Sequence, residues 1–218
     1  MKLENIKANF LGDSITEGCG VADIENVFWN RLKKTYHMAE ARGYGIGGTR
    51  IARQGTDRTP GWDLDFCSRV DDLDPDADLV VVFGGTNDFG HGDVSLGSFC
   101  DRENTSFYGA CRLMMEKLIT KYPGKPIVIL TPLHRLGEEG FHGDGSKAQL
   151  SEPLIAYVRA IREVAEHYSL PVLDLWSVSG LQPAVPAIKE NFVPDGLHPN
   201  DRGHEILAAR IGAFLESL

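Results

Sequence analysis

The sequence predicts an α/β protein, a three-layer α/β/α sandwich with a central parallel sheet of about five strands. Short apolar runs recur along the chain, as expected for strands that are covered on both faces. Amphipathic helical patterns lie between these runs, and strands that alternate with helices pair in parallel through right-handed crossovers. A length of 218 residues fits a single domain, residues 1–218, with a well-buried core.

Five apolar segments have strand character. They are Ile6–Leu11, Ala39–Ile46, Leu79–Phe83, Ile127–Leu130 and Val172–Leu175. Leu79–Phe83 (LVVVF) is the strongest candidate, and Ala39–Ile46 is the weakest. In open parallel sheets, ligands bind beyond the carboxyl ends of the strands. The residues that follow each run are therefore the candidates for chemistry.

Three helices are predicted from apolar residues that recur every three or four positions. They cover Phe107–Leu118, Leu154–Tyr168 and Leu207–Leu218. For the second helix we expect Ser151 as the N-cap, with Leu150 and Ile155 packed together as a hydrophobic staple. Asn200 or Asp201 is expected to cap the third helix.

Composition excludes several classes of function. The net charge of −9, from 22 basic and 31 acidic residues, argues against binding to nucleic acid or to anionic membranes. No apolar run approaches the about 18 residues of a membrane span, and the first ten residues lack a secretory apolar segment. We therefore expect a cytoplasmic protein without membrane insertion. The cysteines have no CxxC spacing, which argues against a zinc site or a redox pair.

Four polar segments follow predicted strands or lie near the C-terminus. They are Gly12–Thr16 (GDSIT), Tyr44–Ala52 (YGIGGTRIA), Gly84–Asp88 (GGTND) and Pro194–Asn200 (PDGLHPN). Ser14 would stand at a strand-to-helix turn, and the glycines of the second segment allow a ligand to approach the backbone closely. Asn87 offers a neutral amide donor. Asp195 and His198 are three positions apart, so the carboxylate can bind the imidazole.

Each segment alone also has a purely structural explanation. A serine at a helix start is more often a cap than a nucleophile, and glycine turns follow strands in many α/β proteins. Together, however, the segments supply a hydroxyl nucleophile, a base, an orienting carboxylate and neutral donors for an oxyanion. The combination points to acyl transfer.

In their order along the chain, the four segments resemble the sequence blocks of the SGNH (GDSL) hydrolase family. The resemblance extends from residue 12 to residue 198 and implies that family's flavodoxin-like α/β/α fold. It further implies a serine esterase with Ser14 as nucleophile, His198 as general base and Asp195 as the group that orients the imidazole. The oxyanion hole would consist of the backbone N–H groups of Ser14 and Gly48 and the side-chain amide of Asn87. No metal and no cofactor are expected.

The expected substrate is a small-molecule ester. Because no long apolar lid is visible, a short acyl group such as acetyl on a carbohydrate or another polar alcohol is favoured. Two alternatives are a lysophospholipase or thioesterase of the same family and a non-catalytic flavodoxin-like binding protein, which would not need Asn87. An α/β-hydrolase requires a GxSxG elbow; Asp93–Gly97 (DVSLG) comes closest and fails at its first position.

Other polar and aromatic residues have two interpretations each. The loop Gly137–Ser146 is either a lid or a passive solvated loop. The repeated tripeptide His-Gly-Asp, at 91–93 and 142–144, is more simply explained by solvated turns than by metal ligands. His204 is expected at a helix surface or cap. Three further side chains either line the substrate side or anchor their loops: Trp62, Phe89 and His134.

Overall fold

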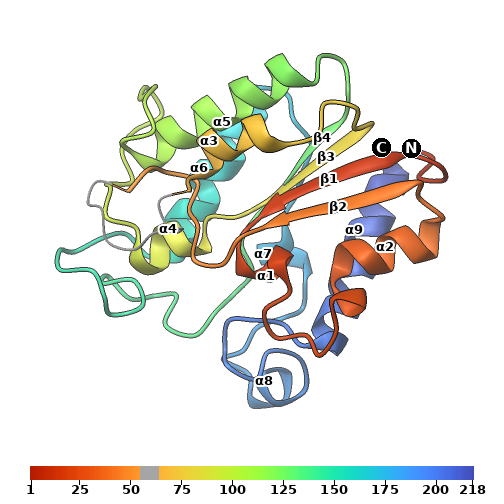
Figure 1. Cartoon of the computed structure of the whole chain (residues 1–218). Coiled ribbons are helices and arrows are strands. Elements are labelled where there is room, and N and C mark those ends of the chain that lie inside the picture. Colours follow the sequence, from red (N-terminus) through yellow and green to blue (C-terminus); the bar gives the residue numbers. More distant parts are fainter. Residues whose placement is uncertain (55–63) are drawn as a thin grey trace.

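The computed structural model describes residues 1–54 and 64–218 and contains a five-stranded parallel sheet (Figure 1). The strands are β1 (Lys7–Gly12), β2 (Glu40–Gly45), β3 (Leu79–Phe83), β4 (Ile127–Leu130) and β5 (Val172–Leu173). Their order in the sheet is β2-β1-β3-β4-β5, and every neighbouring pair is parallel. This order is the flavodoxin-like one, and the predicted α/β fold is confirmed.

Helices cover both faces of the sheet and form the outer layers seen in Figure 1. One face carries α3 (Phe66–Arg69), α5 (Phe107–Lys121) and α6 (Leu154–His167), and the other carries α2 (Phe28–Tyr36) and α9 (Asp201–Ser217). The short helices are α1 (Ser14–Glu17), α4 (Thr86–His91), α7 (Leu175–Val178) and α8 (Pro186–Phe192), with 3₁₀ turns at Ile24–Asn26 and Val70–Asp72. Because α1, α4 and α7 follow β1, β3 and β5, they lie at the carboxyl ends of these strands.

The central strand β3 shows why its sequence is continuously apolar. Val80 and Val82 belong to the core beneath α5 and α6, whereas Leu79, Val81 and Phe83 belong to the core beneath α2 and α9. All five side chains are at most 3% exposed. A strand between two helical layers has no polar face, so its residues cannot alternate between apolar and polar.

Two predicted details are wrong. Helix α6 begins at Leu154 with Pro153 at the N-cap position, and Leu150 is 75% exposed, so Ser151 is not the cap and no staple forms. A cap at Ser151 would require Glu152 to be helical, and the residue before a proline is disfavoured in helical geometry. Strand β5 ends at Leu173, and Leu175 already begins α7. Asn200, one of two predicted caps, accepts from two N–H groups at the start of α9.

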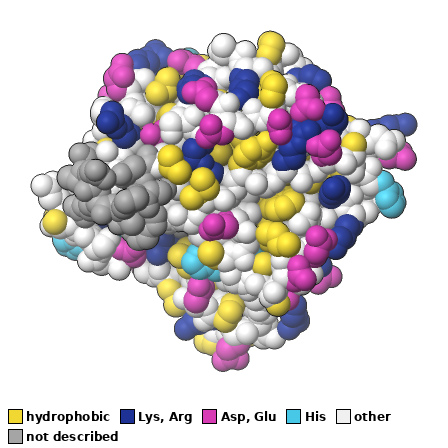
Figure 2. Space-filling view, viewed as in Figure 1, with side chains coloured by type: hydrophobic (Ala, Val, Ile, Leu, Met, Phe, Trp, Pro, Cys, Tyr) yellow, Lys and Arg dark blue, Asp and Glu magenta, His cyan; other side chains and the backbone are white. Residues whose placement is uncertain are grey.

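The surface in Figure 2 has acidic and basic side chains interspersed on the face shown. Among the described residues, no helix has the length and apolar content needed to cross a membrane. The four cysteines are free thiols; Cys67 and Cys111 are buried, Cys19 is partly buried and Cys100 is exposed. Both chain ends lie at the amino end of the sheet, on the side opposite to α1 and α4 (Figure 1).

Candidate active site

Ser14 lies where β1 turns into α1. Gly12 ends the strand, and a Cβ there would approach Thr16 Oγ1 to 2.0 Å, so the turn requires glycine. Asp13 is the N-cap, and its carboxylate accepts a hydrogen bond from the Ile15 N–H at 3.0 Å. Ser14 is therefore the first helical residue, 7% exposed, and its hydroxyl is not needed as a cap.

The structure brings Ser14 together with the C-terminal Asp-His pair. Ser14 Oγ lies 2.9 Å from His198 Nε2, although 184 positions separate the two residues. His198 Nδ1 lies 2.7 Å from Asp195 Oδ2. The other carboxylate oxygen, Oδ1, accepts the backbone N–H groups of Leu197 and His198 at 2.8 and 2.7 Å. The tight turn thus fixes the carboxylate and presents it to the imidazole.

Hydrogen bonds keep the Asp195 carboxylate ionised. Partial burial opposes this, but the N–H groups of His198 and Leu197 and the imidazole hold the pKa of Asp195 below its usual value. Beneath the nucleophile, burial raises the pKa of Asp13 to about 6, and the Ile15 N–H and the His198 charge only partly offset this. An ionised carboxylate that accepts from Nδ1 of an imidazole leaves Nε2 as the proton acceptor.

A glycine turn lies directly over the nucleophile. The Thr49 N–H donates to the Ile46 carbonyl at 3.3 Å, and Gly48 has a φ of +74°, as expected at the third position of a type II turn. A Cβ on Gly47 would lie 3.7 Å from Ser14 Cβ. The N–H of Gly47 already donates to Glu17 Oε2 at 2.8 Å. The Gly47 N–H is thus engaged by Glu17, and the role of the Gly48 N–H as an oxyanion donor stays a prediction.

Asn87, on α4, is tied to the same turn. Its Nδ2 donates one hydrogen to the Thr49 carbonyl at 3.0 Å, and the amide group carries a second hydrogen. The side chain is 6% exposed and thus held in place by its surroundings. The arrangement unites the four sequence segments at one edge of the sheet. It offers a hydroxyl, a base and several neutral donors.

Two buried charged residues support the backbone in and just after the turn, and the sequence analysis does not predict either of them. Asp88 accepts the N–H groups of Ile51 and Ala52 at 3.0 and 2.9 Å, and burial raises its pKa to about 6. Arg69 donates to Thr49 Oγ1 at 2.8 Å and also to the Tyr44 carbonyl, and burial lowers its pKa to about 10. Asp88 adjoins Asn87 in the GGTND segment, which could have drawn attention to it. No local pattern marks Arg69.

Several other predicted residues lie away from this site. Phe89 is fully buried and packs edge-on against Tyr157, so of its two interpretations the anchoring one fits and the substrate-lining one does not. His204 is 0% exposed, so it is not at a helix surface; its Nδ1 accepts the Phe28 N–H at 3.2 Å and caps the start of α2, which was the other predicted contact, and burial lowers its pKa to about 4. Trp62 lies outside the described residues.

His134 lies on the loop after β4 and has a defined partner. Its Nδ1 lies 2.8 Å from Glu138 Oε1, and its ring is 3.8 Å from the Trp176 ring, centre to centre. Two residues on, the Leu136 N–H donates to the Gly196 carbonyl at 2.8 Å. The loop is therefore joined to the turn that carries Asp195 and His198.

Beside this turn lies a groove of about 620 Å³, within the range of small-molecule sites. Its lining residues are mostly apolar and comprise Leu136, Pro183, Ala184, Pro186, Lys189, Glu190 and Pro194. Leu136 and Pro194 belong to the loop and the turn described above. The groove therefore adjoins the turn that carries Asp195 and His198.

The loop Gly137–Ser146 is attached to α4. The Asp144 N–H donates to the Gly90 carbonyl at 2.9 Å, and Lys147, just beyond the loop, donates to the Asp88 carbonyl at 2.8 Å. A role as a lid stays a prediction. No group of three or more His, Cys, Asp or Glu side chains suited to a metal ion occurs in the described part of the chain.

Comparison with known proteins gives a consistent picture. The profile of the GDSL-like lipase/acylhydrolase family matches residues 10–206. GDSL lipase Rv0518 of Mycobacterium tuberculosis is 27% identical over 212 residues, which cover 94% of this chain and 79% of that protein.

Solved structures share the fold. A protein from Lactobacillus plantarum is 29% identical, with a TM-score of 0.84 over 98% of both chains. A two-domain esterase active on acetylated mannans is 24% identical, with a TM-score of 0.64 over 98% of this chain and 49% of that chain. At that identity the second likeness concerns the fold alone.

Proposed function

The chain belongs to the GDSL-like lipase/acylhydrolase (SGNH) family, and we propose that it hydrolyses carboxylic esters through an acyl-enzyme on Ser14. The observation that carries this proposal is the 2.9 Å contact between Ser14 Oγ and His198 Nε2. The contact joins the two groups that must exchange a proton, and it joins opposite ends of the chain. A serine that merely started a helix would not need an imidazole at this distance.

In the proposed reaction, His198 Nε2 takes the hydroxyl proton while Ser14 Oγ attacks the ester carbonyl. Asp195, 2.7 Å from Nδ1, holds the imidazole in the required tautomer and stabilises the imidazolium that forms. His198 then gives its proton to the leaving alcohol, and the acyl group remains on Ser14. A water molecule, activated by the same imidazole, releases the acid.

Negative charge develops on the carbonyl oxygen in both steps. The N–H groups of Ser14 and Gly48 and the Asn87 amide are the proposed donors to this oxygen. Their support comes from fixed surroundings: Gly48 lies in a hydrogen-bonded turn, and Asn87 is anchored on Thr49 at 3.0 Å. Preorganised donors stabilise a developing charge because they need not reorient during the reaction.

For the substrate we propose a short acyl group, such as acetyl, on a carbohydrate or another polar alcohol. The closeness of the Gly47 backbone to Ser14 favours a small acyl group. The alcohol leaves on the side of His198, where the groove bordered by Leu136 and Pro194 offers space. The fold shared with an esterase active on acetylated mannans is consistent with this choice. Lysophospholipase and thioesterase activities are the alternatives within the family.

Replacement of Ser14 by alanine tests the proposal. We expect Ser14→Ala to abolish turnover of p-nitrophenyl acetate and labelling by a fluorophosphonate probe, with an unchanged melting temperature. Turnover by the variant at the wild-type rate would refute the serine mechanism. A panel of esters with increasing acyl length, followed by acetylated sugars and a lysophospholipid, then tests the substrate: faster turnover of long-chain esters would contradict the short acyl group.

A further inference from the structure

The glycine turn over Ser14 is fixed unevenly. Arg69 donates to Thr49 Oγ1, at the end of the turn, and to the Tyr44 carbonyl, in β2 before the turn, and Asn87 donates to the Thr49 carbonyl. In the middle of the turn, the described residues supply one side-chain contact, in which the Gly47 N–H donates to Glu17 Oε2 at 2.8 Å. Glu17 is thus placed to control the part of the turn that adjoins Gly48.

Glu17 reaches this position because the end of β2 packs against α1. A Cβ on Gly45 would approach the Glu17 backbone nitrogen to 2.0 Å, so glycine permits the close contact. A Cβ on Gly47 would lie 2.8 Å from Glu17 Oε2 and 3.7 Å from Ser14 Cβ. The carboxylate therefore lies on the glycine turn, three residues along the helix from the nucleophile.

The two glycines of the turn need such a restraint. Without a Cβ, they have little intrinsic preference for one backbone conformation. The N–H that Glu17 holds belongs to the Ile46–Gly47 peptide, which leads into the central Gly47–Gly48 peptide of the turn. The contact therefore anchors the turn beside Ser14, and with it the residue that carries the Gly48 N–H.

We propose that Glu17 is a positioning residue of the oxyanion hole: its carboxylate holds the Gly47 N–H, and thereby keeps the turn that carries the Gly48 N–H in place beside Ser14. This inference rests on the proposed function, since it assigns Glu17 a role in that reaction. Glu17 acts through Gly47 and does not touch the substrate. The hydrogen bond needs an acceptor oxygen and not a full charge, which distinguishes this role from an electrostatic one.

A pair of substitutions tests the role with p-nitrophenyl acetate as substrate. Glu17→Ala removes the acceptor and is expected to lower kcat about tenfold, while KM changes less than about twofold, because the missing donor acts in the transition state. Glu17→Gln keeps an acceptor oxygen and is expected to stay within about threefold of the wild-type kcat. Inhibition by an alkyl boronic acid, which forms a tetrahedral adduct on serine, should weaken in Glu17→Ala in parallel with kcat/KM.

Glu25→Ala serves as the matched control. Glu25 is an exposed carboxylate that pairs with Lys34 at 2.8 Å and lies outside the proposed site, so its loss should leave kcat unchanged. Because Glu17 is exposed, both variants at this position should fold, and equal melting temperatures would show this. A wild-type kcat in Glu17→Ala, an equal loss in Glu17→Gln, or a rise in KM alone would each overturn the inference.

The outcome for Ser14→Ala separates this inference from the proposed function. If Ser14→Ala is inactive and Glu17→Ala is fully active, the serine mechanism stands and the role of Glu17 falls. If Ser14→Ala turns over the ester at the wild-type rate, both fall.

Discussion

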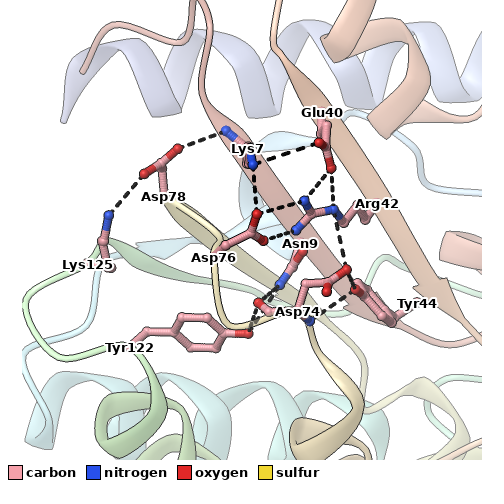
Figure 3. A network of polar contacts seen from close by, with 10 residues as sticks. All are labelled: Lys7, Asn9, Glu40, Arg42, Tyr44, Asp74, Asp76, Asp78, Tyr122 and Lys125. Carbon is pink, nitrogen blue, oxygen red and sulfur yellow. Dashed lines mark hydrogen bonds and ion pairs between the residues drawn. The ribbon is translucent and has the colours of Figure 1, made fainter.

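The two ends of the central sheet carry polar clusters of opposite character. At the amino end, an exposed network joins side chains at or just before the strand starts (Figure 3). Asp76 accepts from Lys7 Nζ at 2.7 Å and from Arg42 Nη1 at 2.6 Å, and Lys125 pairs with Asp78 at 2.9 Å. At the carboxyl end, three charged side chains around the candidate site are instead buried: Asp13, Arg69 and Asp88.

The pKa of the buried aspartates at the carboxyl end is therefore shifted in the opposite direction from the pKa of the exposed aspartate at the amino end. Hydrogen bonds from Arg42 and Lys7 hold the pKa of Asp76 well below its usual value. Burial raises the pKa of Asp13 and of Asp88 to about 6. Water screens the exposed network, so each pair adds little stability. The buried carboxyls cost stability, because desolvation disfavours their charged form, and what they provide is a fixed backbone around Ser14.

The largest expected effect comes from substituting one buried asparagine in each polar cluster. The substitution at the carboxyl end of the sheet should affect catalysis, and the other should affect stability. Asn87→Ala removes a proposed oxyanion donor and should lower kcat/KM for p-nitrophenyl acetate about 10²–10³-fold. Asn9, in β1, is 0% exposed, against 6% for Asn87, and its Nδ2 donates to the Asp74 carbonyl at 2.9 Å. Asn9→Ala should lower the melting temperature by several degrees and leave kcat/KM within about twofold.

Steady-state kinetics and thermal denaturation of both variants check this prediction. An equal loss of kcat/KM in the two variants would mean that the polar clusters at both ends of the sheet affect catalysis. A fully active Asn87→Ala would remove Asn87 from the proposed oxyanion hole.

The same contrast explains how much of the fold the sequence could predict. Leu79–Phe83 and Ile127–Leu130 were predicted with the observed bounds, because a strand buried on both faces is a continuous apolar run. The end of β5 was not predicted, because the apolar Leu175 continues the pattern after the strand has ended. Asp174 ends it: its carboxylate accepts from Thr131 Oγ1 at 2.9 Å and its carbonyl from the Ser177 N–H.

For the candidate site, the sequence separation between two contacting residues decides whether the sequence predicts their contact. Asp195 and His198 are three positions apart and form a recognisable local pattern. Arg69 binds Thr49, 20 positions away in the sequence, and Glu17 binds Gly47, 30 positions away. In both cases the partners come from different elements of the fold. Nothing in the spacing of single residues predicts that β2 packs so closely on α1. The residues of the motifs were therefore predicted, and the residues that position them were not.

A pH titration of stability sharpens the comparison at the carboxyl end. The folded pKa of Asp88 is about 6, above its usual value of 3.8, so the folded state binds the extra proton between these values. Stability from this group is fully present below pH 3.8 and is lost as the pH rises to about 6, by on the order of 2–3 kcal/mol. Asp88→Asn carries no such titration. Its melting temperature relative to the wild type should therefore rise between pH 4 and 6.

Denaturation scans of wild type and Asp88→Asn at half-unit pH steps measure this difference. A constant offset across the range would show that burial does not raise the pKa of Asp88. An offset that falls with pH would show that the carboxylate is stabilised in its charged form, as at the other end of the sheet.

The smallest expected effect concerns Asp76, at the amino end of the sheet, where the pH dependence of stability has the opposite sign to that of Asp88. Because the folded pKa of Asp76 is lowered, its stabilisation is present above pH 3.8 and is lost as the pH falls further. Asp76→Asn should therefore lower the melting temperature at pH 7 by at most a few degrees, and added salt should shrink the difference because the side chain is exposed. Turnover of p-nitrophenyl acetate should not change. A loss that persists in 1 M salt would mean that the network stabilises the edge of β2 through its hydrogen bonds, independently of its charges.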